Sequence, residues 1–204
     1  LFVSVVYLAA WLFSSSDESK NFLATLFFFR SYYPDSPNIW HTGLPIGHIW
    51  SLNVEEHCYI LLSILTLSSF FRTKEYIPLL ILGVGAILLQ VSYVLFPAIA
   101  TDNYHWKTEI VASHLLISAG YFLIKHKFEK NIPSWFPLLT FVLAFLCYST
   151  VAPWFASWMF SPFLLALTIN QLGRLPSFIK RVIEYGPLRL MGLWSYSIYL
   201  WQQP

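Results

Sequence analysis

Two adjacent acidic residues, Glu55 and Glu56, stand at the start of a long apolar run, with His48 before them and His57 directly after. The apolar run continues from Ile60 to Phe71 without a charged residue. Carboxylates and imidazoles are the side chains that most often move protons in catalysis. An acid placed inside a membrane normally faces a protein interior or a water-filled cavity. This segment is therefore the first candidate for chemistry.

A helix has to carry the acidic pair. The residues from Cys58 to Phe71 would rise only about 21 Å as a helix, short of the roughly 30 Å of a hydrocarbon core. We therefore expect the helix to begin near Leu52, with both acids in its first turns. Four polar residues then recur at helical spacing and form one stripe, which predicts that the stripe faces the protein interior: Glu56, Tyr59, Ser63 and Thr66.

Proton transfer to or from a hydroxyl during group transfer is the chemistry that suits this segment best. We expect Glu56, on the stripe, to be the main catalytic carboxylate, with Glu55 and His48 in support. A metal site is not expected, because neither HExxH nor HxxEH occurs. A glutamate-dependent protease fits poorly, since no Arg follows one turn on. The simplest alternative is a pair of interfacial acids at the positive end of a helix.

Composition places the helix in a lipid bilayer. Hydrophobic residues make up 57% of the 204 residues and charged residues 11%, against about 25% charged in soluble domains. The mean hydropathy is +0.59. A water-soluble domain is thereby disfavoured, and 12 basic against 10 acidic residues give no concentrated basic face for nucleic acid.

Apolar segments of about 20 residues predict membrane spans. The expected fold class is an all-α polytopic transmembrane bundle with about five full spans and two partial terminal spans, Leu1–Phe13 and Leu188–Pro204. One full span ends at Phe71. The other four are Ile77–Ala100, Ile110–Ile124, Trp135–Ala152 and Trp154–Leu172. Pro153 separates the last two, which predicts a tight hairpin or one bent element.

The positive-inside rule orients these spans. Three basic residues fall on one side, Lys20, Arg30 and Lys107, and nine on the other. The nine-residue side, predicted to be cytoplasmic, carries Arg72, Lys74, Lys125, Lys127, Lys130, Arg174, Lys180, Arg181 and Arg189. The segment Ser14–Ile49 is then expected outside an inner, cytoplasmic membrane.

Two motifs resemble a known family. The stretch His48-Ile49-Trp50-Ser51-Leu52-Asn53-Val54-Glu55-Glu56-His57-Cys58-Tyr59 resembles the H-x-W-S-L-x-V-E-E-x-F-Y signature of the membrane-bound acyltransferase 3 family. The closing stretch is similar to that family's S-Y-S-x-Y-L-W-H-x-P segment: Ser195-Tyr196-Ser197-Ile198-Tyr199-Leu200-Trp201-Gln202-Gln203-Pro204. Cys58 stands where the family has Phe, and Gln202 where many members have His.

The resemblance implies an integral membrane O-acyltransferase. Such an enzyme moves an acyl group, commonly acetyl from acetyl-CoA, onto a carbohydrate hydroxyl of a surface polysaccharide or lipopolysaccharide. Acyl-CoA is then a donor substrate, and no permanently bound cofactor is expected. The family's proposed catalytic His and Arg pair precede Leu1, so residues 1–204 are interpreted as a single incomplete membrane domain, truncated at both ends.

Two groups of residues are candidates for substrate contact. The first, toward the glycan acceptor, contains Trp40, Trp50, Ser51, Asn53 and Tyr59. The second, toward the phosphates of acyl-CoA, contains Arg174, Lys180 and Arg181. A basic cytoplasmic loop is also what the orientation rule alone produces.

A proton-coupled transporter that uses Glu55 or Glu56 as its proton site is the alternative from another functional class. Transporters of this kind often contain inverted repeats, and the acidic segment has no second copy in the chain. A degenerate membrane protein without catalytic activity is a third interpretation.

Overall fold

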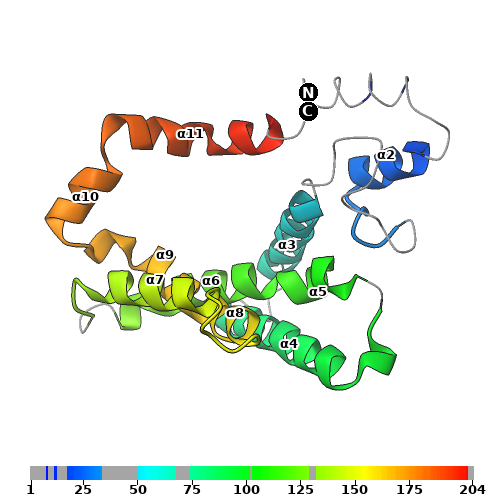
Figure 1. Ribbon diagram of the computed structural model, residues 1–204, viewed down its shortest axis with the longest axis horizontal. Coiled ribbons are helices and arrows are strands. Elements are labelled where there is room, and N and C mark those ends of the chain that lie inside the picture. Colours follow the sequence, from blue (N-terminus) through cyan, green and yellow to red (C-terminus); the bar gives the residue numbers. More distant parts are fainter. Residues whose placement is uncertain are drawn as a thin grey trace. The chain divides into compact units, whose positions relative to one another are not determined.

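The computed structural model describes residues 18–33, 50–67, 74–101, 103–128 and 132–201, together with positions 8 and 12. All regular elements within these ranges are helical, and no strand occurs among them (Figure 1). The all-helical part of the expected fold class is therefore confirmed. The chain divides into two compact units. The first unit comprises Leu1–Tyr59, Thr101–Thr108 and Gly186–Pro204, and the second comprises Ile60–Ala100 and Glu109–Tyr185.

The first unit contains the acidic segment. Its elements are α2 (Glu18–Leu26), the N-terminal part of α3 (Trp50–Leu67), the 3-10 turn η4 (Tyr104–Trp106) and α11 (Gly186–Trp201). Helix α3 starts at Trp50, so the prediction that the helix reaches back beyond Cys58 is confirmed. Glu55 and Glu56 consequently lie in the second turn of α3.

An unusual turn ends α2. Phe28 has a positive φ of 61°, a left-handed conformation that usually belongs to glycine at this position. The Phe28 N–H donates to the Thr25 carbonyl at 3.2 Å, and the Phe29 N–H donates to the Ala24 carbonyl at 2.6 Å. This is the hydrogen-bond pattern of a Schellman motif. It reverses the chain so that residues 29–33 form a second tight turn, in which Phe29 accepts hydrogen bonds from Tyr32 and Tyr33.

The second unit is a bundle of apolar helices. It contains α4 (Tyr76–Leu95), most of α5 (Thr108–Val111), α6 (Ser113–Ile124), α7 (Phe136–Cys147), α8 (Ala156–Met159), α9 (Ser161–Asn170) and α10 (Ser177–Ile183). The 3-10 turns η3 (Pro97–Ile99), η5 (Lys125–Lys127) and η7 (Leu172–Arg174) extend α4, α6 and α9. Helix α6 packs against α4 and α9, and α9 also packs against α7 (Figure 1).

Two glycines allow α4 and α6 to pack closely. Residues at three- and four-residue spacing bury one face of α4, including Leu79, Gly83 and Ile87. A Cβ atom at Gly83 would lie 2.6 Å from Ile117 Cγ1, and one at Gly120 would lie 2.8 Å from Leu80 Cδ2. Glycine therefore lets the two helices approach. Ile87, Ile117 and Ala166 then form a shared core with Trp158 packed against it.

The helices are shorter than the expected spans. Helix α4 ends at Leu95 rather than continuing to Ala100, because Pro97 starts a 3-10 turn. The expected span Ile110–Ile124 is split between α5 and α6, and Trp154–Leu172 between α8 and α9, where Pro162 lies near the start of α9. Around Pro153 the chain turns back so that α9 packs against α7, as the tight-hairpin alternative predicted.

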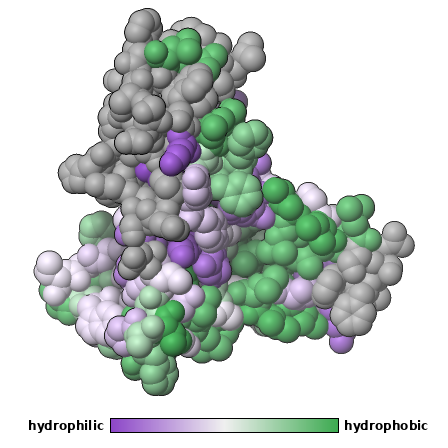
Figure 2. All heavy atoms as spheres, turned by 90° about the vertical axis from the view of Figure 1, so that its right-hand side faces the viewer, coloured by the Kyte–Doolittle hydropathy of each residue, from purple (hydrophilic) through white to green (hydrophobic). Residues whose placement is uncertain are grey.

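One described helix, α4, is long and apolar enough by itself to cross a membrane. Helices α7 and α9 are apolar but shorter. Figure 2 shows apolar side chains over much of the described surface on the face that it presents. The expected count of five spans stays a prediction. The partial span Leu1–Phe13 lies almost wholly outside the described residues, whereas α11 shows that the second terminal segment is helical as far as Trp201.

Candidate functional site

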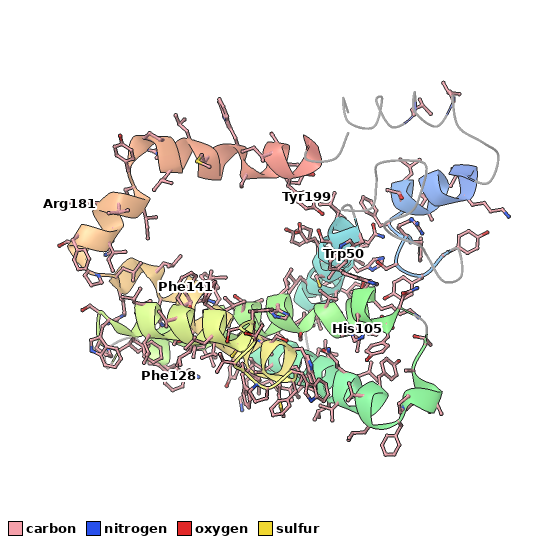
Figure 3. The ribbon with its side chains drawn as sticks, in the orientation of Figure 1. Trp50, His105, Phe128, Phe141, Arg181 and Tyr199 are labelled. Carbon is pink, nitrogen blue, oxygen red and sulfur yellow. The ribbon has the colours of Figure 1, made fainter. Side chains whose placement is uncertain are left out.

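The two motifs meet in the first unit. Ser51 Oγ, in the first turn of α3, lies 2.6 Å from Tyr199 Oη near the end of α11, so the two hydroxyls share a hydrogen bond across 148 residues of sequence. Tyr199 is labelled in Figure 3. Glu55 lies four residues after Ser51 and therefore on the same helix face. A serine and a tyrosine thus meet at this junction of the motifs, with Glu55 one helical turn after that serine.

Two of the four residues of the predicted polar stripe do not face the interior. The Tyr59 side chain is 52% exposed, and Ser63 is exposed as well. The buried side chains of this part of α3 are Asn53, Val54 and Cys58 instead. The prediction assumed that polar residues on an apolar helix point inward. The first unit instead buries the neighbouring face of α3, which carries Asn53, Val54 and Cys58. Both acids are half-buried, and Glu55 is the one that shares a helix face with Ser51.

His57 forms the second group of contacts on α3. Its Nδ1 lies 2.7 Å from the Thr108 hydroxyl. Its ring is 6.0 Å from the ring of Phe29 and 6.0 Å from that of Tyr32. The Thr108 N–H donates to Tyr32 Oη at 3.1 Å. His57 therefore joins α3 to the turn after α2 and to the start of α5.

Aromatic rings gather beside this histidine. The rings of Trp50 and Trp106 meet edge to face, 4.7 Å apart at 68°. The Lys107 ammonium lies 5.8 Å from the Tyr32 ring and donates to the Thr101 hydroxyl at 2.7 Å. The acceptor contact predicted for Trp50 stays a prediction, and Trp106 is a ring partner that the sequence did not reveal.

Three buried polar residues lie in the same unit. Asn53 and Ser31 are both 0% exposed, and Arg30 is 3% exposed. Burial lowers the pKa of the Arg30 guanidinium from its ordinary value, because desolvation disfavours the charged form. Asn53, expected to contact substrate, is fully buried, and its predicted role stays a prediction. His48 and Trp40 lie outside the described residues, so their predicted roles stay predictions.

Basic side chains gather at one end of the second unit. The Lys127 ammonium lies 5.1 Å from the Tyr76 ring, which brings the end of α6 to the start of α4. Arg174 donates to the Ile132 carbonyl at 3.1 Å, which brings the end of α9 to the start of α7. Lys180 and Arg181 follow on α10. The phosphate contacts and the orientation of this end stay predictions, and Arg174 already has a backbone partner.

Several members of this arrangement carried no individual signal in the sequence. Tyr199 belonged to the second motif, so pairing the two motifs would have found it. Trp106, Thr108 and Tyr32 are single residues of short turns and of the start of α5, and nothing in their spacing shows that they contact α3.

Two curated proteins are similar to this chain. The first is the peptidoglycan O-acetyltransferase OatA of Listeria monocytogenes serovar 1/2a, 24% identical over 179 residues, which cover 78% of this chain and 28% of OatA. The second is YrhL of Bacillus subtilis strain 168, provisionally named a peptidoglycan O-acetyltransferase, 26% identical over 182 residues, which cover 78% of this chain and 28% of YrhL.

The chain thus spans 28% of the length of each of these relatives. No family model matches it, and no solved structure matches it. The similarity supports a relationship to O-acyltransferases. Neither relative is named a transporter, so the transporter alternative gains no support.

Proposed function

We propose that this chain belongs to an integral membrane O-acyltransferase that moves an acyl group, acetyl in the first instance, from acyl-CoA to a carbohydrate hydroxyl of a surface glycan. The observation that carries the proposal is the Ser51–Tyr199 hydrogen bond, which joins the two motifs on the helix that bears both acids. The names of the two relatives agree with this chemistry and favour a cell-wall glycan as the acceptor.

Acyl transfer to a hydroxyl requires that the hydroxyl proton be removed as the new ester bond forms. A carboxylate of the acidic pair is the proposed base, with His48 in support. Glu55 shares a helix face with Ser51, which supports it for this role, while Glu56 remains the candidate derived from the sequence pattern. Trp50, Tyr59, Asn53 and Trp40 are the proposed acceptor contacts.

The donor is proposed to approach the basic end of the second unit. Coenzyme A carries several phosphate charges, and Arg174, Lys180 and Arg181 supply positive charge close to one another in sequence. The charged end of coenzyme A is then bound by side chains that the acyl transfer itself does not use. No permanently bound cofactor is part of this proposal.

The proposed topology is multi-pass, with Ser14–Ile49 outside an inner, cytoplasmic membrane and the basic end inside. Support comes from the clustering of Lys127, Arg174 and Lys180 at one end of the apolar helices. Single cysteines introduced at Ser15 and at Lys127 of a variant without Cys58 and Cys147 should be labelled by a membrane-impermeant maleimide from opposite faces. Labelling of both from one face would contradict the topology.

The test of function expresses the full-length protein in cells that lack their own enzyme for cell-wall O-acetylation. Its expression should restore ester-linked acetate on purified wall glycan, released by mild base and measured as free acetate. A Glu55→Gln, Glu56→Gln double variant should restore none while inserting in the membrane at normal levels. Restoration of acetate by the double variant would show that neither acid is required for acyl transfer. Absence of acetate with the wild-type protein would contradict the proposed function.

A further inference from the structure

A cavity of about 360 Å³ lies beside α2 in the first unit. The side chains that line it all belong to α2 or to the turns that follow this helix: Lys20, Leu23, Ala24, Phe27, Phe29 and Tyr33. The left-handed residue Phe28 brings these turns back toward the helix. Ligand pockets commonly measure about 300–1,000 Å³, so this cavity has the size for one small ring compound.

The lining of this α2 cavity combines aromatic rings with a cation. Phe27, Phe29 and Tyr33 are exposed, and so is Lys20. Apolar rings supply packing area in a ligand pocket, and a charged group fixes the orientation of the ligand. A sugar ring suits this lining, because its C–H face packs on aromatic rings while its polar substituents stay at the edge. The ammonium of Lys20 favours a sugar on which one substituent is a carboxylate.

Positive charge gathers around the same turns. The three basic residues that the orientation rule places outside all belong to the first unit. Lys20 lines the cavity, Arg30 is buried in the turn that supplies its aromatic rings, and the Lys107 ammonium lies 5.8 Å from the centre of the Tyr32 ring. A guanidinium remains protonated in proteins. The acidic pair of α3 alone would repel an anion, and these basic side chains offset that repulsion.

The α2 cavity adjoins the helix that carries the acids. Phe29 lines the cavity, and its ring also lies 6.0 Å from the ring of His57. His57 directly follows Glu56 on α3. This position favours a substrate over a bilayer lipid as the occupant. A lipid headgroup gains nothing from a place beside the acids, whereas a glycan chain must extend past the residues that act on it.

We propose that the α2 cavity binds an acidic sugar residue of the acceptor glycan, a neighbour along the chain of the sugar whose hydroxyl is acylated. The identity of the occupant rests on the proposed function, but its binding requires no acyl transfer. Phe27, Phe29 and Tyr33 contact the sugar ring, and Lys20 pairs with its carboxylate. A glycan held at this second point is oriented for the reaction at the first.

N-acetylmuramic acid and N-acetylglucosamine are matched probes, because the two sugars differ by one ether-linked lactate that carries a carboxylate. Their binding to the purified full-length protein is measured by ligand-detected NMR titration without any acyl donor. The acid should bind more tightly than the neutral sugar. Lys20→Gln should remove that preference by weakening binding of the acid about 2- to 5-fold. Lys20→Arg keeps the positive charge and should keep the preference.

Phe27→Ala tests the aromatic contact. It should weaken binding of both sugars about 2- to 10-fold. The matched control is Leu26→Ala, since Leu26 is an exposed residue of α2 that is not part of the cavity lining, and it should weaken neither. Unchanged thermal midpoints show that the variants are folded.

Three results would overturn the proposal. The first is equal binding, or no binding, of the two sugars to the wild-type protein. The second is a preference for the acid that survives Lys20→Gln. The third is a Phe27→Ala variant that binds both sugars normally but inserts poorly in membranes, which would identify the cavity as a bilayer contact. A protein that prefers the acid but transfers no acetyl would contradict the proposed function alone.

Discussion

The two units treat buried polar side chains differently. In the second unit such groups are paired: Thr140 with Thr168 at 2.8 Å, and Ser161 with Tyr148 at 2.9 Å. In the first unit Asn53 and Ser31 are fully buried without a hydrogen-bond partner among the described residues. A satisfied polar pair fixes helix packing, whereas a buried group without a partner costs free energy. The described part of the first unit is therefore less completely satisfied than these pairs of the second unit.

Backbone strain follows the same division. The described non-glycine residues with positive φ are Phe28 and Asn103, at 61° and 55°, and both belong to the first unit. Residues in sparsely populated conformations concentrate at functional sites, where the surrounding structure maintains them. Here they shape the two segments that contact His57 and Trp50.

The largest expected effect in the first unit is loss of the acidic pair. General-base help is worth typically 10²–10⁴-fold, or about 3–5.5 kcal/mol. Because Glu55 shares a helix face with Ser51, the partner of Tyr199, Glu55→Gln should reduce ester-linked acetate by about that factor, and Glu56→Gln should reduce it less. Acetate release and membrane-protein level are measured together. A larger loss in Glu56→Gln would restore the ranking derived from the sequence stripe.

The second unit should respond through stability rather than chemistry. Gly83→Ala would place a Cβ 2.6 Å from Ile117 Cγ1 and 3.1 Å from its backbone nitrogen, so α4 and α6 must separate. Overpacking of this kind destabilises by about 1–3 kcal/mol. Thermal unfolding in detergent should show the loss.

Gly85→Ala is the matched control on the same helix, because a Cβ there meets nothing within 4 Å. Its higher helix propensity should leave stability unchanged or raise it by up to about 1 kcal/mol. Equal losses in both variants would mean that α4 and α6 do not pack as described.

Helix type and placement followed from the sequence because apolar length and periodicity dictate them. The start of α3 and the hairpin at Pro153 were predicted from these two signals. Helix ends were missed where proline interrupts, as at Pro97 and Pro162. The prediction of which face of α3 is buried was wrong, because burial depends on the segments that pack against the helix. Tyr32 and Thr108 reach His57 from distant positions, and no local pattern encodes such contacts.

Removal of His57 should weaken the first unit. His57→Ala deletes the hydrogen bond to Thr108 and the contacts with Phe29 and Tyr32, which together are worth about 1–2 kcal/mol. The matched control is His126→Ala, since His126 is exposed in η5, and it should change stability little. Thermal unfolding of the two variants is the measurement. Equal midpoints would contradict a stabilising role for the contacts of His57.

The Ser51–Tyr199 hydrogen bond should have a smaller effect. A single net hydrogen bond contributes about 0.5–1.5 kcal/mol, so Tyr199→Phe should lower acyl transfer by about 2- to 10-fold. Tyr196→Phe, on an exposed tyrosine of the same helix, should leave it unchanged. Ser51→Ala combined with Tyr199→Phe should lose no more than either single variant. Similar losses in the two tyrosine variants would show that the junction is not specific.

The smallest effect is a gain of stability at the strained turn. A non-glycine residue in the left-handed region destabilises the folded state by about 1–2 kcal/mol. Glycine removes this strain, but part of the gain is offset because glycine loses more conformational entropy on folding. Phe28→Gly should therefore raise the free energy of unfolding by about 0.5–1 kcal/mol. Phe28 is 37% exposed, so some buried apolar area is lost and sets the upper end of this range. Phe27→Gly, one residue earlier and without positive φ, should instead lower the free energy of unfolding, because glycine gains nothing there and loses more entropy on folding. If both variants lower it equally, Phe28 is not strained. Phe28→Gly could instead stabilise the protein and slow acyl transfer. That result would mean that the strained turn serves function, because it positions Phe29 and Tyr32 against His57.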